Sequence, residues 1–452
     1  MAREDDGVSR ADDGELLGWT AKQGRILSGG GVAEKFYTDF TQSQLPHHHL
    51  LAGTTHEAFA RWRRGDSFDG SAGCSGFPTA VCGVWNRPLF TGGWEHSSDA
   101  TELVYNTQTP TLFIDLRIPR LRPPFVARGH TSLKTLTDHE LKCFARQHCF
   151  SGYSLLGGTV DEPDVTRHHI IDWNFVGKPR SRPNRWRVEM KHPSSQRIHS
   201  ATTSLSERWL RASGNVWKEW SFAKDGFGQH YYMERWERRG CDGCGSEKNA
   251  ANNENGGRLL ALRTARGTPR DKVILVVGAH FAFARARQLS FKSNASQSWT
   301  FDEASTEVGS LVGVVDAAIE NGDRARAEAF LSLEGGHGLI TPANAWLVDA
   351  ATHPWQEGTA CAELVLQDEH GQTAPPTSAD ARVVAAAERR GGLAKSVDWF
   401  LEATVHLAGD QWDIVECSFQ SAEALETFLR VSQARSTSSM IQLPKGQHTS
   451  RL

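Results

Sequence analysis

Apolar and polar residues alternate along many short segments of the chain, which is the pattern of strands buried on one face. The clearest segment is 111–119, TLFIDLRIP, which carries Asp115 and Arg117 on one face and aliphatic side chains on the other. Side chains two positions apart on a strand lie roughly 6.5 to 7 Å apart, so this couple can meet or share a ligand. We expect the couple to line the inside of a barrel.

Further strands are predicted by the same period of two, each bounded by Gly, Pro or Ser clusters. They lie at 77–90, 101–119, 167–177, 185–191, 228–239, 258–266, 271–291, 326–338, 344–358 and 411–420. The segments 258–266 and 271–291 are expected to form a hairpin, because a Gly-Thr-Pro-Arg turn separates them.

Few helices are predicted. The clearest is at 135–148, where Thr137 and Glu140 have the spacing of a capping box. Apolar residues from 308 to 319 have helical spacing and stop at Asn321-Gly322, and short helices are also expected at 54–64 and 421–434.

Many strands and few helices, in two similar halves around a polar linker, predict a mainly β protein of two antiparallel barrels. The expected parts are a partly disordered N-terminal region at 1–70, a first barrel at 71–239, a linker or long loop at 240–257, a second barrel with helical insertions at 258–435 and a flexible tail at 436–452.

The bulk composition is that of an ordinary soluble, intracellular protein. The 452 residues are 39% hydrophobic and 23% charged, and the net charge is -3. The sequence has neither a basic face for nucleic acid nor an apolar run long enough to cross a bilayer, so we predict no nucleic acid partner and no membrane insertion. Cysteines are too sparse for a disulfide framework and are expected to be reduced.

Several short motifs, in order along the chain, resemble those of a family of uncharacterised bacterial proteins with fungal relatives. Gly83-Val84-Trp85 resembles the Gly-x-Trp that opens lipocalin-like (calycin) barrels. The segment 101–119 resembles the family hallmark through Gln108, Leu112, Phe113, Asp115, Arg117 and Pro119. Asn106 and Thr107 depart from it, since the family leads us to expect Trp and Leu there. The resemblance implies two calycin-like barrels in one chain and brings no established activity.

The charged couple at Asp115 and Arg117 is the first candidate site. Inside a barrel it would be desolvated, and it could orient the polar head of a ligand. A structural ion pair near the barrel mouth, or one on a solvated outer face, is the alternative. The predicted ligand-binding residues are Phe113, Asp115, Arg117, Tyr232, Glu234 and Trp236.

A carboxylate beside an imidazole could instead support acid/base chemistry, since burial shifts both titrations toward neutrality. The candidate catalytic residues are His168 with Asp172, expected on one face of a strand, and Glu234. Such pairs can also serve only to satisfy hydrogen bonds. His280 lies in an apolar strand and could ligate haem or a metal, although a core histidine explains it as well.

No metal site and no cofactor are predicted. The histidines at 47–49, and Cys241 with Cys244, lack the further ligands that complete a zinc or copper site. Phosphate-loop, dinucleotide-binding, nucleophile-elbow and zincin motifs are absent from the sequence.

The predicted function is the binding of a small, largely apolar molecule with a polar head in the first barrel. Two alternatives remain open: an isomerase, hydrolase or dehydratase acting on a lipid-like or secondary metabolite in the same barrel, and a protein-interaction scaffold with filled barrels. The C-terminal Ser450-Arg451-Leu452 has the pattern of a peroxisomal import signal. We therefore expect the import receptor as a partner and the peroxisome as the location, with the cytoplasm otherwise.

Overall fold

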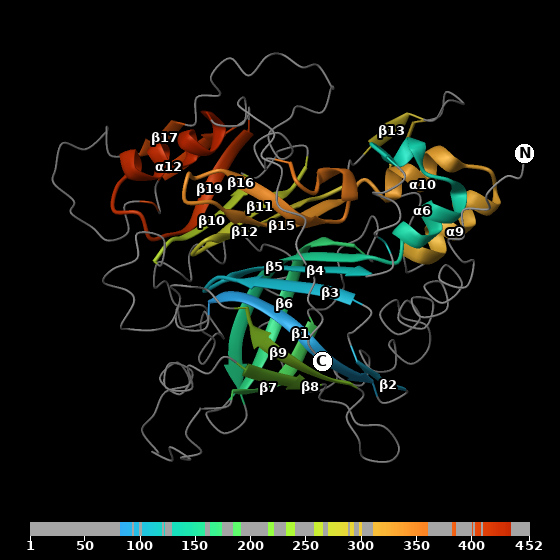
Figure 1. Cartoon of the computed structure of the whole chain (residues 1–452), viewed down its shortest axis with the longest axis horizontal. Helices are drawn as coiled ribbons and strands as arrows, with labels where there is room; N and C mark the ends of the chain where they lie inside the picture. Colours follow the sequence, from blue (N-terminus) through green and yellow to red (C-terminus); the bar gives the residue numbers. More distant parts are fainter. Residues whose placement is uncertain are drawn as a thin grey trace, which may run out of the picture.

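The protein is described from a computed structural model of the whole chain (Figure 1). The structure describes residues 82–92, 95–98, 102–119, 122, 129–158, 163–173, 184–190, 216–220, 232–239, 257–264, 270–287, 290–292, 298–300, 311–359, 382–385, 400, 403–407 and 410–434. The predictions for residues 1–70, for Cys241 and Cys244, and for the C-terminal tripeptide lie outside these ranges.

The first half of the chain forms a closed antiparallel barrel of eight strands. Its strands are β1 (Gly83–Gly92), β3 (Glu102–Gln108), β4 (Leu112–Pro119), β5 (His148–Gly158), β6 (Pro163–Asp172), β7 (Asn184–Met190), β8 (Val216–Trp220) and β9 (Tyr232–Arg238). Each strand pairs with its neighbour in sequence, and β9 pairs back onto β1, which closes the sheet. The short β2 (Glu95–Ser98) pairs with the end of β1. A closed antiparallel barrel in the first half of the chain is confirmed, and its calycin-like assignment stays a prediction.

The second half forms an eight-stranded antiparallel sheet in the order β16-β15-β12-β11-β10-β19-β18-β17. Its strands are β10 (Leu259–Thr264), β11 (Lys272–Val277), β12 (His280–Arg285), β15 (Glu334–Ile340), β16 (Trp346–Ala351), β17 (Arg382–Ala385), β18 (Ala403–Leu407) and β19 (Asp410–Cys417). The predicted hairpin is the pair β10 and β11, but its predicted second arm at 271–291 is divided into β11, β12 and β13. Among the described residues the edge strands β16 and β17 do not pair, so this sheet is open there and a second barrel stays a prediction. A separate two-stranded sheet joins β13 (Ser290–Lys292) and β14 (Ser298–Thr300).

Four short α-helices accompany the sheets in the described part of the chain, and none of its helices is long and apolar enough to span a membrane. They are α6 (Asp138–Phe144), α9 (Leu311–Glu320), α10 (Arg324–Phe330) and α12 (Ala422–Ala434), with 3-10 turns η3 (Leu133–Thr135) and η4 (Pro354–Gln356). The capping box of Thr137 and Glu140 at the start of α6 is confirmed.

One strand prediction, at 326–338, is wrong over its first part. Residues there continue the helix α10, because the Asp323 side chain accepts a hydrogen bond from the Arg326 amide and the alanine-rich stretch favours a helix. The strand β15 begins only at Glu334, beyond Leu331 at the end of the helix.

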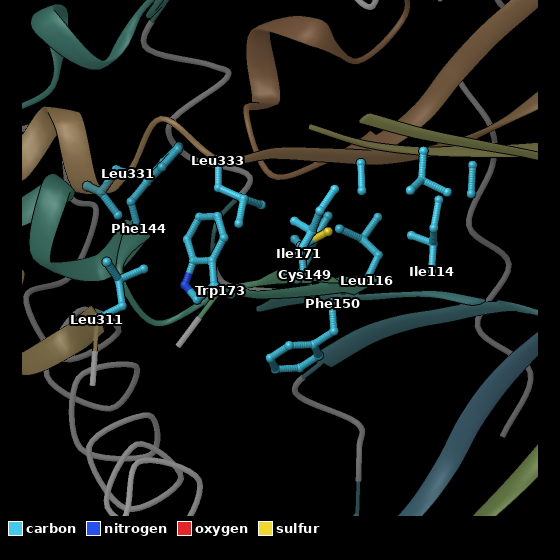
Figure 2. Packing of buried hydrophobic residues seen from close by; sticks show 14 of the residues in the cluster. Ile114, Leu116, Phe144, Cys149, Phe150, Ile171, Trp173, Leu311, Leu331 and Leu333 are labelled. Atoms are coloured by element: carbon cyan, nitrogen blue, oxygen red, sulfur yellow. The ribbon is translucent and has the colours of Figure 1, made fainter. Parts of the chain in front are cut away.

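The barrel and the open sheet pack face to face as two layers (Figure 1). The aliphatic face of β4, with Ile114 and Leu116, points out of the barrel toward the second sheet, where it belongs to the same buried cluster as Leu275 and Ala282. We call the contact between the two layers the seam. In Figure 2, Phe150 points away from the seam, on the other side of the strand from Cys149. The outer wall of β3, β4 and β5 is therefore apolar because it is covered.

Polar contacts hold the two layers together at the ends of the seam. Arg287, which follows β12, donates hydrogen bonds to the backbone oxygens of Asp172 and Trp173 at 2.8 and 2.5 Å. Burial lowers the pKa of Arg287 to about 10, so the guanidinium stays charged at neutral pH. The Thr111 hydroxyl donates to the Glu416 carboxylate of β19.

The seam also contains a close approach that requires glycine. Gly335 of β15 lies against the Cys149 side chain of β5, and a β-carbon at this position would overlap the Cys149 sulfur. Both residues are buried, so neither layer can move aside into solvent.

We expect Gly335→Ala to destabilise the protein by about 1–3 kcal/mol, because it overpacks the seam. Denaturant unfolding followed by tryptophan fluorescence measures this change. Cys149→Ala removes the overlapping sulfur, so the double variant should be more stable than Gly335→Ala alone. Strictly additive losses in this double-mutant cycle would contradict the proposed contact.

Candidate functional site

The interior of the barrel is charged. Alternation along the strands places one set of side chains outward and the other inward, and the outward set of β3–β5 is the apolar wall of the seam. The inward set includes seven buried or nearly buried charged residues: Arg87, Glu102, Asp115, Arg117, Arg167, Glu219 and Glu234. Buried charges are tolerated only where they are paired and hydrogen-bonded, so their pairing decides what the site can do.

Asp115 forms the central ion pair of this interior. Its two carboxylate oxygens accept hydrogen bonds from Nε and Nη2 of Arg117 at 2.9 and 3.0 Å. Arg167 of β6 approaches the same carboxylate at 3.4 Å. Burial alone would raise the pKa of Asp115, but the two guanidinium groups outweigh it and lower this pKa to about 2. Asp115 is thus ionised throughout the physiological range.

A second pair of contacts links the opposite side of the barrel. Arg87 of β1 bonds Glu102 at 2.9 Å and Glu234 at 2.6 Å, and Arg117 reaches Glu234 at 3.7 Å. Burial opposes ionisation of Glu234, but Arg87 and Arg117 hold its pKa below the usual value. The network therefore joins β1, β3, β4, β6 and β9 across the interior.

Glu219 is the exception to this pairing. It lies directly opposite Glu234 on neighbouring strands, and the two carboxyl groups are hydrogen-bonded. Burial, followed by the adjacent Glu234, raises the pKa of Glu219 well above the usual value. Because two carboxylates in contact cannot both ionise in a buried site, the proton resides on Glu219.

Tryptophan rings line part of this charged interior. Trp85 stacks on Trp217 with ring centroids 4.2 Å apart, and Trp217 lies 6.0 Å from Trp236. Trp186 belongs to the same buried cluster, and the guanidinium of Arg167 lies 5.2 Å from its ring centroid. The rings supply the flat apolar surface that a small-molecule site uses.

Asn106 faces the interior from β3, opposite Asp115 in the register. Its side chain is fully buried, yet neither its amide nitrogen nor its oxygen has a hydrogen-bond partner in the structure. The indole nitrogen of Trp236 is likewise buried without a partner. A buried polar group without a partner costs about 1–3 kcal/mol, so these atoms are an unrelieved cost in the interior of the barrel.

The barrel brings together Phe113, Asp115, Arg117, Glu234 and Trp236 from the predicted ligand-binding set on its inward face. The guanidinium of Arg167 covers the Phe113 ring at 4.2 Å. Tyr232 lies at the start of β9, opposite Gly92, and its side chain is outside the described residues.

The predicted catalytic pair of His168 and Asp172 is not the pair that the structure forms. Asp172 instead bonds Nδ1 of His169, the residue that follows His168, at 2.7 Å. A bulge in the pairing of β5 with β6 shifts the register, so His169 lies opposite Gly152 while His168 lies opposite Tyr153. The side chain of His168 is outside the described residues.

His280 is held in a hydrogen-bonded chain away from the barrel interior. Its Nδ1 lies 3.2 Å from Nε2 of His337, whose Nδ1 lies 2.8 Å from Asp349. Burial lowers the pKa of His337, which favours the neutral ring. The described residues contain no group of three or more His, Cys, Asp or Glu that could hold a metal ion.

The sequence-based analysis missed four members of the charged network, Arg87, Glu102, Arg167 and Glu219. Arg87 and Glu102 lie at even spacing from Trp85 and Val104, so the period of two on β1 and β3 carried a usable signal. Glu219 lies on the five-residue strand β8, whose partners only the closed sheet reveals.

Comparison with known proteins gives a structural neighbour. The chain is similar to the crystal structure of an uncharacterized protein, YLR301w, from Saccharomyces cerevisiae, with 12% sequence identity and a TM-score of 0.35, over 74% of this chain and 98% of that chain. Models of known protein families and curated proteins gave no match.

The proton on Glu219 makes a pH-dependent prediction for stability. A carboxyl whose folded-state pKa is raised stabilises the fold fully below its unfolded pKa of about 4.3, and this stability is lost as the pH rises through the folded pKa. Glu219→Gln keeps the neutral shape and does not titrate. Its free energy of unfolding, relative to the unmodified protein, should increase by up to about 1.4 kcal/mol per pH unit from about pH 5 upward.

The matched variant Glu234→Gln should be less stable than the unmodified protein at neutral pH, whereas Glu219→Gln should be more stable. It removes the carboxylate that pairs with Arg87 and Arg117, so we expect a loss of about 3–5 kcal/mol at neutral pH. Urea unfolding at several pH values compares the two variants. Equal pH dependence of Glu219→Gln and the unmodified protein would show that Glu219 is ionised in the folded state.

Proposed function

We propose that the barrel binds a small molecule with a largely apolar body and a polar head in its interior. The observation that carries the proposal is Asn106, a fully buried amide whose donor and acceptor both lack a partner. A ligand head that supplies an acceptor and a donor would relieve this cost. Apolar walls with a few convergent polar groups are the usual chemistry of such sites.

The surrounding residues suit the two parts of such a ligand. The ion pairs of Asp115 with Arg117 and of Glu234 with Arg87 are fixed by several hydrogen bonds, so they present a rigid polar surface. The indole of Trp236 offers an apolar face together with a free N–H donor. Antiparallel barrels of eight strands enclose an interior just wide enough for side chains or one small ligand, and a calycin-like barrel belongs to this size class.

An enzyme on the same scaffold is the second candidate, and Glu219 with Glu234 favours it. Two buried carboxyls whose pKa values are pushed apart are an arrangement suited to acid and base roles. In place of the catalytic residues predicted from the sequence, His168, Asp172 and Glu234, this candidate has Glu219 as the acid and Glu234 as the base. A scaffold with a filled interior is the third candidate, and Asn106 argues against it.

We further propose import into the peroxisome through Ser450-Arg451-Leu452, which matches the pattern that the import receptor reads.

The ligand proposal predicts opposite effects of Asn106→Leu on stability and on binding. Without ligand, the variant should be more stable by about 1–3 kcal/mol, because a buried unpartnered amide is removed. Native mass spectrometry of the protein purified from its own cells should show a retained small molecule in the unmodified chain and none in the variant.

Ser151→Ala is the control for this experiment. Ser151 also carries a buried hydroxyl without a partner, but it lies opposite Ile114 on the outward face of the barrel wall. The control should keep the retained molecule. Equal retention by Asn106→Leu and by the unmodified protein would overturn the role of Asn106, and no retained molecule in any of them would count against ligand binding.

Import into the peroxisome predicts that a fluorescent protein fused to the N-terminus gives a punctate, peroxisomal pattern of fluorescence. Deleting Leu452 should release the fusion into the cytosol, because the receptor reads a free C-terminal tripeptide. A punctate pattern that persists after the deletion would contradict the proposal.

A further inference from the structure

We propose that the head of the ligand is a cation, a protonated amine, which takes the place of the proton held between Glu219 and Glu234. This inference rests on the proposed function and names the chemical class that the interior accepts. It follows from three observations: the pairing of the charges, the position of the tryptophan rings and the unpartnered amide of Asn106.

Within the network of seven charged residues, the charges balance only while Glu219 holds a proton; Asp172, on the same inward face, is paired with His169. Arg87, Arg117 and Arg167 supply three positive charges, and Glu102, Asp115 and Glu234 supply three negative charges, each within ion-pair distance of a partner. Within the described ranges, no cation lies within ion-pair distance of Glu219, which is 4% exposed. The network can therefore balance one further positive charge, which the proton on Glu219 supplies in the free protein.

The tryptophan rings lie beside this carboxyl pair. Trp217 and Trp236 face each other in the register of β8 and β9, and Glu219 and Glu234 face each other two positions along the same strands. Residues two apart on a strand share a face, so the acids and the indoles line one patch of the interior. Carboxylates next to indole faces attract an ammonium group, through its charge and through cation–π contact.

Asn106 adds an acceptor and a donor to the same interior. Its side-chain oxygen lacks a hydrogen-bond donor, and an ammonium group has N–H groups to share beyond those used by the carboxylates. A carboxylate ligand is disfavoured, because each arginine of the network already bonds a protein carboxylate. An added anion would leave the interior with an uncompensated charge, which is costly in a buried site.

The exchange is a balanced, non-covalent step. The amine enters as its ammonium form, Glu219 loses one proton to the solvent, and no covalent bond other than this O–H bond changes. Binding thus releases one proton as long as Glu219 is protonated in the free protein. By linkage, the dissociation constant should decrease up to roughly tenfold for each unit of pH increase in that range.

Three probes of similar size and different charge test the inference: 2-phenylethylammonium, 2-phenylethanol and phenylacetate. Titration of the full chain, followed by tryptophan fluorescence, gives the affinity at several pH values. Calorimetry in two buffers of different ionisation enthalpy counts the protons. We expect the ammonium probe to bind at least about tenfold more tightly than the others and to release one proton at neutral pH.

Glu219→Gln separates the exchange from simple charge attraction. The variant has no proton to release, so the ammonium probe should bind at least about tenfold more weakly, with no pH dependence and no proton release. The control is Glu320→Gln, the same substitution on the exposed face of α9, where the Glu320 side chain is 69% exposed. It should leave all three readouts unchanged.

The outcomes distinguish failure of the cation inference from failure of ligand binding in the barrel. Tighter binding of phenylacetate or phenylethanol, or ammonium binding that is independent of pH, overturns the cation inference and leaves ligand binding in the barrel intact. Failure of the ammonium probe to bind also overturns it. Ligand binding itself stands or falls on the retained molecule seen by native mass spectrometry.

Discussion

The second sheet covers the outer wall of the barrel, and this contact determines what the barrel interior contains. A strand has two faces, and on β4 the apolar face with Ile114 and Leu116 is used against the second sheet. The remaining face must then point inward, and it carries Asp115 and Arg117. On β4, apolar side chains therefore lie outside and the charged couple lies inside, and this couple contributes to the chemistry of the site.

A charged interior imposes its own constraint, because each ion removed from water needs a partner. Three guanidinium groups and three carboxylates satisfy one another, which fixes the strands that carry them. Glu219 cannot join this balance as an anion without leaving a net charge. Its protonation follows from burial first and from contact with Glu234 second, both of which raise its pKa.

The period of two was sufficient to predict most strands of the barrel and the inward couple, since both depend on local alternation, but it did not predict β5 or β8. It failed where the geometry depends on partners distant in sequence. The bulge between β5 and β6 places His169 beside Asp172, and a simple count of two along the strand selects His168. The short β8 was unrecognisable until its neighbours were known, so Glu219 was missed. The helix α10 has few apolar residues, so their spacing does not distinguish it from a strand, and the deciding signal is the cap at Asp323.

The seam and the interior are also connected through a single residue. Arg287, which follows β12, donates a hydrogen bond to the backbone oxygen of Asp172. The side chain of Asp172 is hydrogen-bonded to His169 on the same strand. A shift of the second sheet would move the end of β6, which also carries Arg167 toward Asp115. Since packed layers resist continuous deformation, the second sheet acts as a rigid support that sets the positions of the interior charges. The contact between the second sheet and the barrel thus helps to preorganise the charged network inside the barrel.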